Sequence, residues 1–298
     1  MAIKTPNETQ SHSCEQDQFD TVEIYNKSMI QHGPYNDRVY LMKLSHDDFP
    51  AIIDYLDTLA TTHGYSKLFV KIPAWATEEF LIKGYRTEAI IPRFYGSAID
   101  GYFVSRYRTK ARKHVPAPLQ QQMKKVLRTA LNNKGQSKNI TSATADIVEL
   151  LKEKHADQLA ALYRAVFQTY PFPIFDTDYI KQKMKKDTRF YGVFHNADLI
   201  AASSSELDYD GSNVEFTDFA TLPAHRGGNL SYVLLRYMES DMKPMKMTTG
   251  YTIARSLSYG MNITFCRRGY RYAGALVNNT CISGNIQSMN VYYKHFIE

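Results

Sequence analysis

The chain has 298 residues, a length typical of about two domains, and 44% of them are hydrophobic and 13% aromatic. This composition excludes disorder throughout the chain, and 15 glycines and 11 prolines are too few for a collagen-like or low-complexity protein. The 36 lysines and arginines exceed the 30 aspartates and glutamates, and the net charge of +6 suits a polyanionic partner, either a nucleotide cofactor or a nucleic acid.

The first 20 residues are polar and show no basic segment followed by an apolar one, as a signal peptide would. We therefore expect a disordered tail over residues 1–20 of a cytoplasmic protein. No apolar run approaches the roughly 20 residues that a membrane-spanning helix needs, so no membrane partner is expected. Three cysteines without CxxC spacing and histidines without ligand spacing predict neither a disulfide framework nor a metal site.

Residues 21–115 alternate between strand and helix patterns, which predicts a first α/β domain. Its expected elements are a strand over 38–44, a helix opened by Ser45 and Asp48, a strand over 67–72, a helix over 74–83 and two strands within 86–107. Residues 116–144 form the expected linker, and Leu119, Val126 and Ala130 fall at helical spacing within it. The linker therefore contains a connecting helix.

Residues 145–298 continue the alternation and form the expected second domain. Its expected elements are two helices, strands over 189–195, 199–207 and 214–222, a helix from Leu230 to Met238, a strand over 248–254, a helix over 256–267, and strands over 270–277 and 289–296. The segments 80–86 and 265–271 share the pattern F-x-x-x-G-Y-R at the same place in the two layouts. We therefore expect the first domain to be a degenerate copy of the second.

The most informative segment is AHRGGNLS, from Ala224 to Ser231, between a predicted strand and an amphipathic helix. Gly227 and Gly228 allow a tight turn in which successive N–H groups point outward, and the helix N-terminus adds a partial positive charge. The segment is neither a Walker loop nor a GxGxxG fingerprint, but it predicts a cradle for a pyrophosphate. The corresponding turn at 44–48 has no glycine and carries two carboxylates, so we expect only the second domain to hold a phosphorylated cofactor.

The strand, the RGGN turn, the helix, the TIA strand and the helix that precedes Gly269-Tyr270 together resemble the GNAT superfamily of acetyl-CoA-dependent N-acetyltransferases. The closer resemblance is to the β-lysine N-acetyltransferases, and it covers the chain from about residue 20 onward. The segments that carry it are residues 30–44, 216–231, 251–262, 278–280 and 288–294. It implies an α/β (α+β) GNAT fold with a mixed, mostly antiparallel central sheet flanked by helices, and a degenerate GNAT-like N-terminal half. It also implies acetyl-CoA as cosubstrate.

The resemblance places the cofactor at the loop and at the helix after the TIA strand. The implied cofactor-binding residues are Leu222, His225, Arg226, Gly227, Gly228, Asn229, Leu230, Ser231, Asn262 and Phe265. The alternatives are a surface histidine for His225 and, for Asn262, a residue that orients its own helix. Ala224 and Asn229 depart from the superfamily pattern [QR]-x-x-G-x-[GA], which keeps only its central glycine here. Phe265 stands where related enzymes carry a tyrosine that protonates the leaving thiolate, so Tyr270 is our substitute, with Tyr259 or an unaided thiolate as alternatives.

The implied reaction needs a base, because an alkyl ammonium has a pKa of about 10.4 and must lose a proton before it attacks a thioester. Glu215 and Asp218 lie on the strand that enters the loop, and strict alternation places them on opposite faces, so that only one can face the cleft. Glu206 and Asp208 on the preceding strand are the next choices. The alternative for each carboxylate is a solvated position on its strand.

β-Lysine carries two amines and one carboxylate, so its site needs a cation and an acid. Arg255, at the end of the TIA strand, is our candidate for the carboxylate, and Glu206 and Asp208 are candidates for the spectator ammonium. We expect the chain to acetylate the N6 amine of β-lysine by direct attack. In this family the product, N-acetyl-β-lysine, is a compatible solute.

Two other functions stay open. The chain could acetylate another amine, an α-lysine-type metabolite or a protein- or RNA-associated substrate, with the basic residues 106–128 as the docking surface. Asn229 and Phe265 also leave room for a binding module without catalysis. We do not expect a nucleic acid as the partner, and we expect a monomer or a homodimer.

Overall fold

The computed structural model describes residues 19–136 and 148–296. The predicted tail lies almost entirely outside this range, as does the end of the predicted linker. Within the described residues, no helix is long and apolar enough to cross a membrane.

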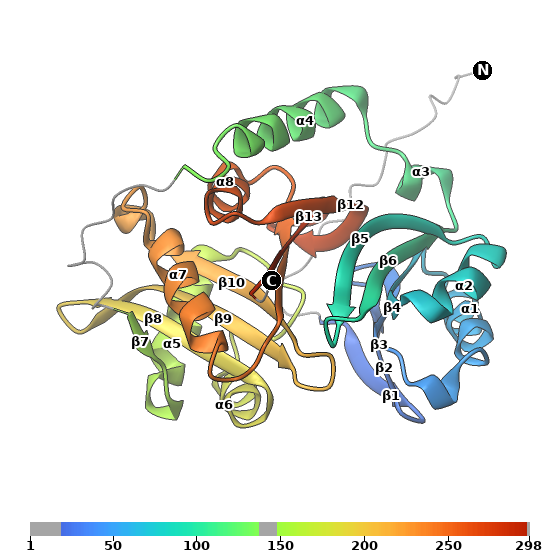
Figure 1. Cartoon of the computed structure of the whole chain (residues 1–298), viewed down its shortest axis with the longest axis horizontal. Coiled ribbons are helices and arrows are strands. Elements are labelled where there is room, and N and C mark those ends of the chain that lie inside the picture. The colour runs from blue at the N-terminus through green and yellow to red at the C-terminus, as the bar shows by residue number, and fades with distance from the viewer. Residues whose placement is uncertain (1–18, 137–147, 297–298) are drawn as a thin grey trace, which may run out of the picture.

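A single sheet of 13 strands runs through both halves of the molecule (Figure 1). The strands of the N-terminal half are β1 (Thr21–Tyr25), β2 (Ser28–Gly33), β3 (Arg38–Lys43), β4 (Lys67–Pro73), β5 (Arg86–Tyr95) and β6 (Ile99–Tyr107). The strands of the C-terminal half are β7 (Val148–Leu150), β8 (Thr188–His195), β9 (Asp198–Asp208), β10 (Asn213–Thr221), β11 (Thr249–Arg255), β12 (Arg271–Ile282) and β13 (Asn285–His295).

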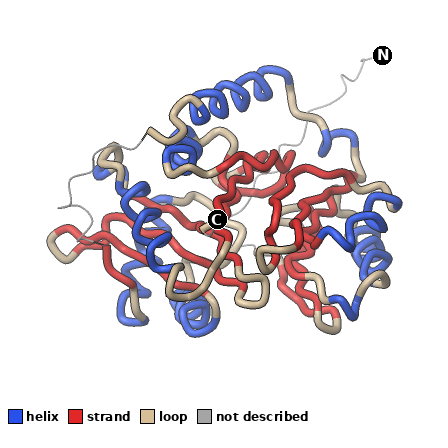
Figure 2. Tube along the Cα trace, in the orientation of Figure 1, coloured by secondary structure: helices blue, strands red, loops and turns tan. Residues whose placement is uncertain are grey.

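The described residues form eight α-helices. They are α1 (Ile52–Thr62), α2 (Thr77–Ile82), α3 (Lys110–Lys113), α4 (Ala117–Leu131), α5 (Ala156–Val166), α6 (Thr177–Lys186), α7 (Leu230–Met242) and α8 (Tyr259–Arg267). Of these helices, α4 packs against α8 at the edge of the molecule (Figure 2). In the C-terminal half, alternate residues of β9 face opposite cores, Ala201 toward α7 and Ala202 toward α5 and α6. The helices and strands expected from the sequence are all present, whereas β1, β2, β7 and α3 were not predicted.

The strand order repeats on the two sides of the β5–β12 pair. Reading outward, it is β5-β6-β4-β3-β2-β1 on one side and β12-β13-β11-β10-β9-β8-β7 on the other. Each half contains one parallel pair joined through a helix, β3 with β4 and β10 with β11, and the remaining pairs are antiparallel. This arrangement is the mixed, mostly antiparallel sheet that we expected, present twice.

The shared F-x-x-x-G-Y-R segments adopt the same local structure. Gly84 and Gly269 each follow a helix with positive φ, +86° and +83°, a conformation that favours glycine. The next residue, Tyr85 or Tyr270, donates its N–H to the carbonyl of the phenylalanine five positions earlier, at 3.1 Å in both halves. The ring of that phenylalanine meets the ring of its tyrosine edge-on, with centroids 5.0 Å apart in both cases. The segments are therefore equivalent in structure as well as in sequence.

The two halves are joined through the middle of β12. Gly274 pairs with Ala89 of β5, and a Cβ at Gly274 would lie 2.0 Å from the Glu88 carbonyl oxygen, so only glycine allows this approach. Beyond this pair the register of β12 shifts, and its backbone bonds to side chains of the N-terminal half. Lys67 Nζ donates to the Val277 carbonyl at 2.7 Å, and Arg112 Nε donates to the Asn278 carbonyl at 2.8 Å. The junction is therefore polar and closely fitted.

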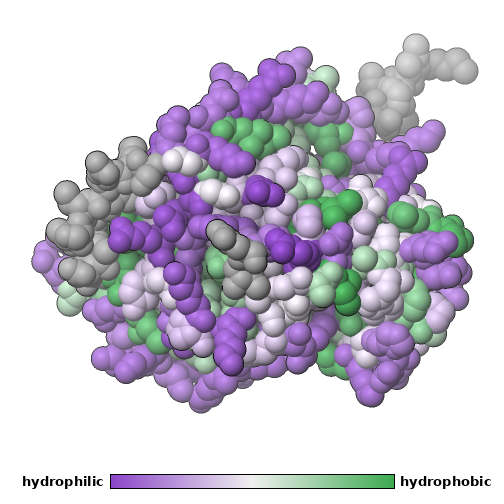
Figure 3. Space-filling model, in the orientation of Figure 1, coloured by the Kyte–Doolittle hydropathy of each residue, from purple (hydrophilic) through white to green (hydrophobic). Residues whose placement is uncertain are grey.

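The surface over α4 is strongly hydrophilic (Figure 3). Lys124, Lys125 and Arg128 of this helix are exposed. Arg106 and Arg112 of the same basic stretch instead pair with Asp57 and Asp37, respectively. The stretch thus includes cations with structural roles. Separately, Cys266 is a buried free thiol, whereas Cys281 is disulfide-bonded.

Candidate active site

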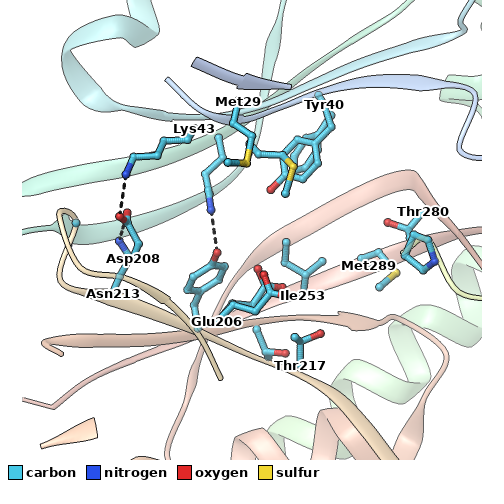
Figure 4. Close-up of a pocket in the computed structure, with 18 of the residues that line it drawn as sticks. Met29, Tyr40, Lys43, Glu206, Asp208, Asn213, Thr217, Ile253, Thr280 and Met289 are labelled. Atoms are coloured by element: carbon cyan, nitrogen blue, oxygen red, sulfur yellow. Dashed lines mark hydrogen bonds and ion pairs between the residues drawn. The ribbon is translucent and has the colours of Figure 1, made fainter. Parts of the chain in front are cut away.

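A cavity of about 820 Å³ lies between the two halves and takes residues from both. Figure 4 shows Met29, Tyr40 and Lys43 entering from the N-terminal half, opposite Glu206, Thr217, Ile253 and Met289 of the C-terminal half. Its size suits a small molecule, and both charged and aromatic side chains line it.

The cavity reaches the point where β10 and β11 separate. These parallel strands are paired only over Asn213–Glu215 and Thr249–Tyr251, although both continue further. Beyond the pairing, Thr217 of β10 and Ile253 of β11 line the cavity wall. Ligands of α/β sheets bind at the carboxyl ends of parallel strands where the sheet opens in this way.

Glu215 lies at this opening, next to two groups that stabilise its charge. The Tyr251 hydroxyl hydrogen-bonds to its carboxylate, and Lys71 of β4 is close enough to attract it. Burial outweighs both effects and, with the repulsion from Glu206, raises the pKa of Glu215 to about 7. A carboxylate with such a pKa accepts and releases a proton near neutral pH.

Asp218 also lines the cavity, which corrects the prediction that only one of the two β10 carboxylates can face it. The register of β10 against β9 shifts between Thr217 and Ala220, and Asp218 has a φ of +55°. This β-bulge breaks the alternation of side chains. Asp218 accepts hydrogen bonds from the Tyr170 hydroxyl and, at 2.5 Å, from Ser204 Oγ, while burial raises its pKa to about 6.

The two further acids of the prediction line the same cavity. Glu206 is the cross-strand partner of Glu215, so the two carboxylates share one face of the sheet. Lys183 Nζ lies 3.7 Å from the Glu206 carboxylate. Asp208 accepts a hydrogen bond of 3.2 Å from Asn213 Nδ2 and lies 3.5 Å from Lys43 Nζ. The cavity therefore has a strongly acidic wall on β9 and β10.

The predicted phosphate loop has the geometry of an anion cradle. Gly227 has a φ of +88°, and a Cβ there would meet no atom within 4 Å, so the space beside it is open. Asn229 is left-handed with a φ of +60° and precedes α7. The backbone N–H groups of Tyr232 and Val233, in the first turn of α7, donate hydrogen bonds to the Asn229 carbonyl at 2.9 and 3.1 Å. The helix amides before them are oriented to bind a phosphate group.

The other predicted cofactor residues are divided between this loop and the protein interior. His225 and Leu222 line a second, smaller cavity beside the loop. Phe265 is fully buried in the core. Asn262 donates to the carbonyls of Arg255 and Ser258 and accepts from Asn290 and Tyr292, which uses its hydrogen-bonding capacity within the protein.

The two remaining predicted residues differ in their access to the cavity. Tyr270 is fully buried among Phe216 and Phe265, away from the residues that line the cavity. Arg255 does line the cavity, and its Nη1 donates to Ser283 Oγ at 2.8 Å. The charge of Arg226, in the phosphate loop, acts on Arg255 and lowers its pKa, although burial lowers it more.

The N-terminal counterpart of the loop is filled by protein. Asp48 accepts hydrogen bonds from the Lys27 amide at 3.1 Å and from Ser28 Oγ at 2.6 Å, and Asp47 pairs with Lys27 Nζ at 2.6 Å. Two carboxylates therefore occupy the turn that in the other half is open and lined by amides.

Sequence analysis missed most of the residues that line the cavity, and among these Arg38, Lys71, Tyr170 and Tyr251 bear on the proposed chemistry. Lys71 and Arg38 lie on strands of the other half, and their proximity to β10 depends on the β5–β12 junction. Tyr251 was within a segment that supports the family resemblance, but no pattern marked it. Among the described residues, no group of three or more His, Cys, Asp or Glu side chains is placed to hold a metal ion.

Comparisons with known proteins find two relatives that match most of this chain. A β-lysine N6-acetyltransferase of Methanococcus maripaludis is 37% identical over 269 residues, which are 90% of this chain and 96% of that protein. A β-lysine N6-acetyltransferase of Methanosarcina mazei is 27% identical over 267 residues, 82% of this chain and 96% of that protein. An acetyltransferase structure from Salmonella typhimurium with its cofactor acetyl-CoA covers 51% of this chain and 94% of its own, at 13% identity and a TM-score of 0.45. No family model matches the chain.

Proposed function

The chain belongs to the family of β-lysine N6-acetyltransferases, and from this premise we propose that it transfers the acetyl group of acetyl-CoA to the N6 amine of β-lysine. The observation that supports this most directly is the small cavity with an acidic wall at the opening between β10 and β11. The first of these strands, β10, leads into the predicted phosphate loop. The open space beside Gly227 and the amides that begin α7 fit the pyrophosphate of coenzyme A.

We propose Glu215 as the general base. When bound, acetyl-CoA supplies the thioester that the amine attacks directly, without an acyl-enzyme. Glu215 takes the proton from the N6 ammonium, because its pKa is raised to about 7 and Lys71 and Tyr251 stabilise its charged form. Asp218 then has a positioning role, since Tyr170 and Ser204 already donate to it. Tyr270 has no access to the cavity, so we propose that the thiolate leaves unaided.

Glu206 and Asp208 are the proposed partners of the ammonium that does not react. Both lie on the acidic wall, and Glu206 lies across from the proposed base. A cation there is attracted by several carboxylates in a partly buried cavity, where such contacts are stronger than in water. This arrangement favours a diamine over a monoamine.

The proposed division of labour assigns the cofactor to residues 145–298 and part of the amine site to residues 21–115, with 116–144 as the linker. We also propose a cytoplasmic enzyme, acting as a monomer or a homodimer, whose product is a compatible solute. The basic stretch 106–128 does not favour a protein or RNA substrate, because Arg106 and Arg112 are engaged within the protein.

An acetyl-transfer assay with β-lysine, α-lysine and a lysine peptide side by side tests the proposal. We expect β-lysine to give the highest kcat/KM and the product to carry its acetyl group on N6, which nuclear magnetic resonance identifies. Equal activity on the lysine peptide would contradict the proposed substrate, and failure to bind acetyl-CoA would support the binding module instead.

A further inference from the structure

Arg38, on β3 of the N-terminal half, is a buried cation on the cavity wall without a carboxylate partner among the described residues. Its side chain is only 3% exposed. Its Nη1 donates to the Asn279 carbonyl at 2.6 Å and to Thr280 Oγ1 at 3.2 Å, and Nη2 donates to Gln31 Oε1 at 3.2 Å. These three acceptors are neutral, and Nε has no hydrogen-bond partner.

The two other buried cations among the described residues each have a carboxylate partner. Lys67 Nζ lies 3.1 Å from Glu88, and Arg112 Nη1 lies 3.2 Å from Asp37. The charge of Asp20 acts on Arg38, but these two described residues form no ion pair. The carboxylate oxygens of Asp20 instead accept hydrogen bonds from the backbone N–H groups of Tyr35 and Asn36, at 3.0–3.3 Å. A buried guanidinium without a paired anion is costly, and a ligand carboxylate would offset that cost.

The position of Arg38 relative to the acidic wall gives the cavity two charged ends. Figure 4 shows Thr280, which accepts from Arg38, at one end of the cavity, and Asp208 with Lys43 at the other. The guanidinium carbon lies 5.0 Å from the centre of the Tyr40 ring, and the charges of both Glu215 and Arg38 act on the Tyr40 hydroxyl. One tyrosine therefore links the cationic end to the proposed base.

We propose that Arg38 binds the carboxylate of the amine substrate and so selects an amino acid over a simple diamine. This inference rests on the function proposed above and replaces Arg255 in that role. The charge of Arg226, in the predicted phosphate loop, acts on Arg255, so we assign Arg255 to the cofactor side of the cavity. β-Lysine has its carboxylate at one end of its carbon chain and the reacting amine at the other, which matches a cavity with Arg38 at one end and Glu215 further along the wall. The amine that does not react lies two carbons from the carboxylate, so this orientation narrows its proposed partners to Glu206, the neighbour of Glu215, and leaves out Asp208 at the far end.

The test compares β-lysine with its carboxamide, which keeps both amines but has no carboxylate, in the full-length enzyme. We expect the wild type to prefer β-lysine by at least 10-fold in kcat/KM, as is typical of a charge-assisted hydrogen bond. Arg38→Gln should lower kcat/KM for β-lysine by about 10- to 100-fold and leave that for the carboxamide within about 3-fold. Arg38→Lys should have a kcat/KM for β-lysine between those of the wild type and Arg38→Gln, because lysine keeps the positive charge but lacks the planar donors of the guanidinium.

Two variants control for other causes. Arg255→Gln should affect both substrates equally, through the KM for acetyl-CoA, and Arg86→Gln, which is exposed, should change neither. A wild type that uses the carboxamide as well as β-lysine overturns the proposal, even if no Arg38 variant folds. An equal loss on both substrates in Arg38→Gln also overturns it and assigns Arg38 a structural role. If the wild type acetylates a different amine and not β-lysine, the proposed function itself has failed.

Discussion

Lys71 Nζ donates a hydrogen bond of 2.9 Å to the Tyr251 hydroxyl, and this contact joins β4 of the N-terminal half to β11 of the C-terminal half at the wall of the cavity. Tyr251 in turn hydrogen-bonds to Glu215. A residue of the half that lacks a phosphate loop thus acts on the carboxylate that we propose as the base.

Lys71→Met should raise the pKa of Glu215 above its value of about 7, because the lysine charge favours the ionised carboxylate. The base must be ionised to accept a proton, so activity declines as the pH falls through this pKa. We expect the acid limb of the pH profile of kcat/KM to move to higher pH in the variant. Lys83→Met, which removes an exposed lysine paired with Asp54, is the matched control and should leave the limb in place.

Glu215→Gln should lower kcat at pH 7 by about 10²–10⁴-fold, the usual contribution of a general base. Activity should recover partly at high pH, where more of the substrate is free amine. Asp218→Asn should cost less, since its carboxylate is already engaged with Tyr170 and Ser204. If Asp218→Asn shows the larger loss and the recovery at high pH, the roles of the two residues are exchanged.

Gly227→Asp should weaken acetyl-CoA binding by roughly 10²-fold or more, because it puts a negative charge beside the pyrophosphate. The new side chain would meet no protein atom within 4 Å of its Cβ, so the fold should be retained. Calorimetric titration measures the affinity. Gly227→Ala is the control for backbone strain at a φ of +88°, and it should lose less affinity. Equal affinities in Gly227→Asp and the wild type would remove the loop from the cofactor site.

Titration with acetyl-CoA should give one site per chain. Asp47 and Asp48 fill the turn of the N-terminal half that corresponds to the phosphate loop. A second site per chain would show that this half binds the cofactor in spite of its carboxylates. Isothermal titration calorimetry on the full-length protein measures the number directly.

Gly274→Ala should destabilise the protein by about 2–4 kcal/mol, because its Cβ would collide with the backbone of β5 at the junction of the halves. Denaturant unfolding measures the change. Gly260→Ala, in α8, is the matched control, since a Cβ there meets nothing within 4 Å. A Gly274→Ala protein as stable as the control would mean that the two strands separate without cost.

The order of helices and strands could be predicted from the sequence because apolar periodicity and turn residues are local signals. The predicted phosphate loop likewise rests on a local signal, since its glycines are adjacent in sequence. The joint position of Glu215 and Asp218 was not, because a single extra residue at a β-bulge reverses which face a side chain takes. The roles of Arg38 and Lys71 depend on pairing between β5 and β12, which are about 180 residues apart, and no local pattern encodes such a contact.

If only the C-terminal half binds the cofactor, as we propose, the two halves of the enzyme can diverge separately. The phosphate loop and the acidic wall lie in the C-terminal copy, whereas Arg38, Tyr40 and Lys71 come from the N-terminal copy. After duplication, one copy can keep the acyl chemistry while substitutions in the other change which amine is accepted. Mutations in the N-terminal copy can therefore change which amine is accepted, while the catalytic residues of the C-terminal copy stay the same.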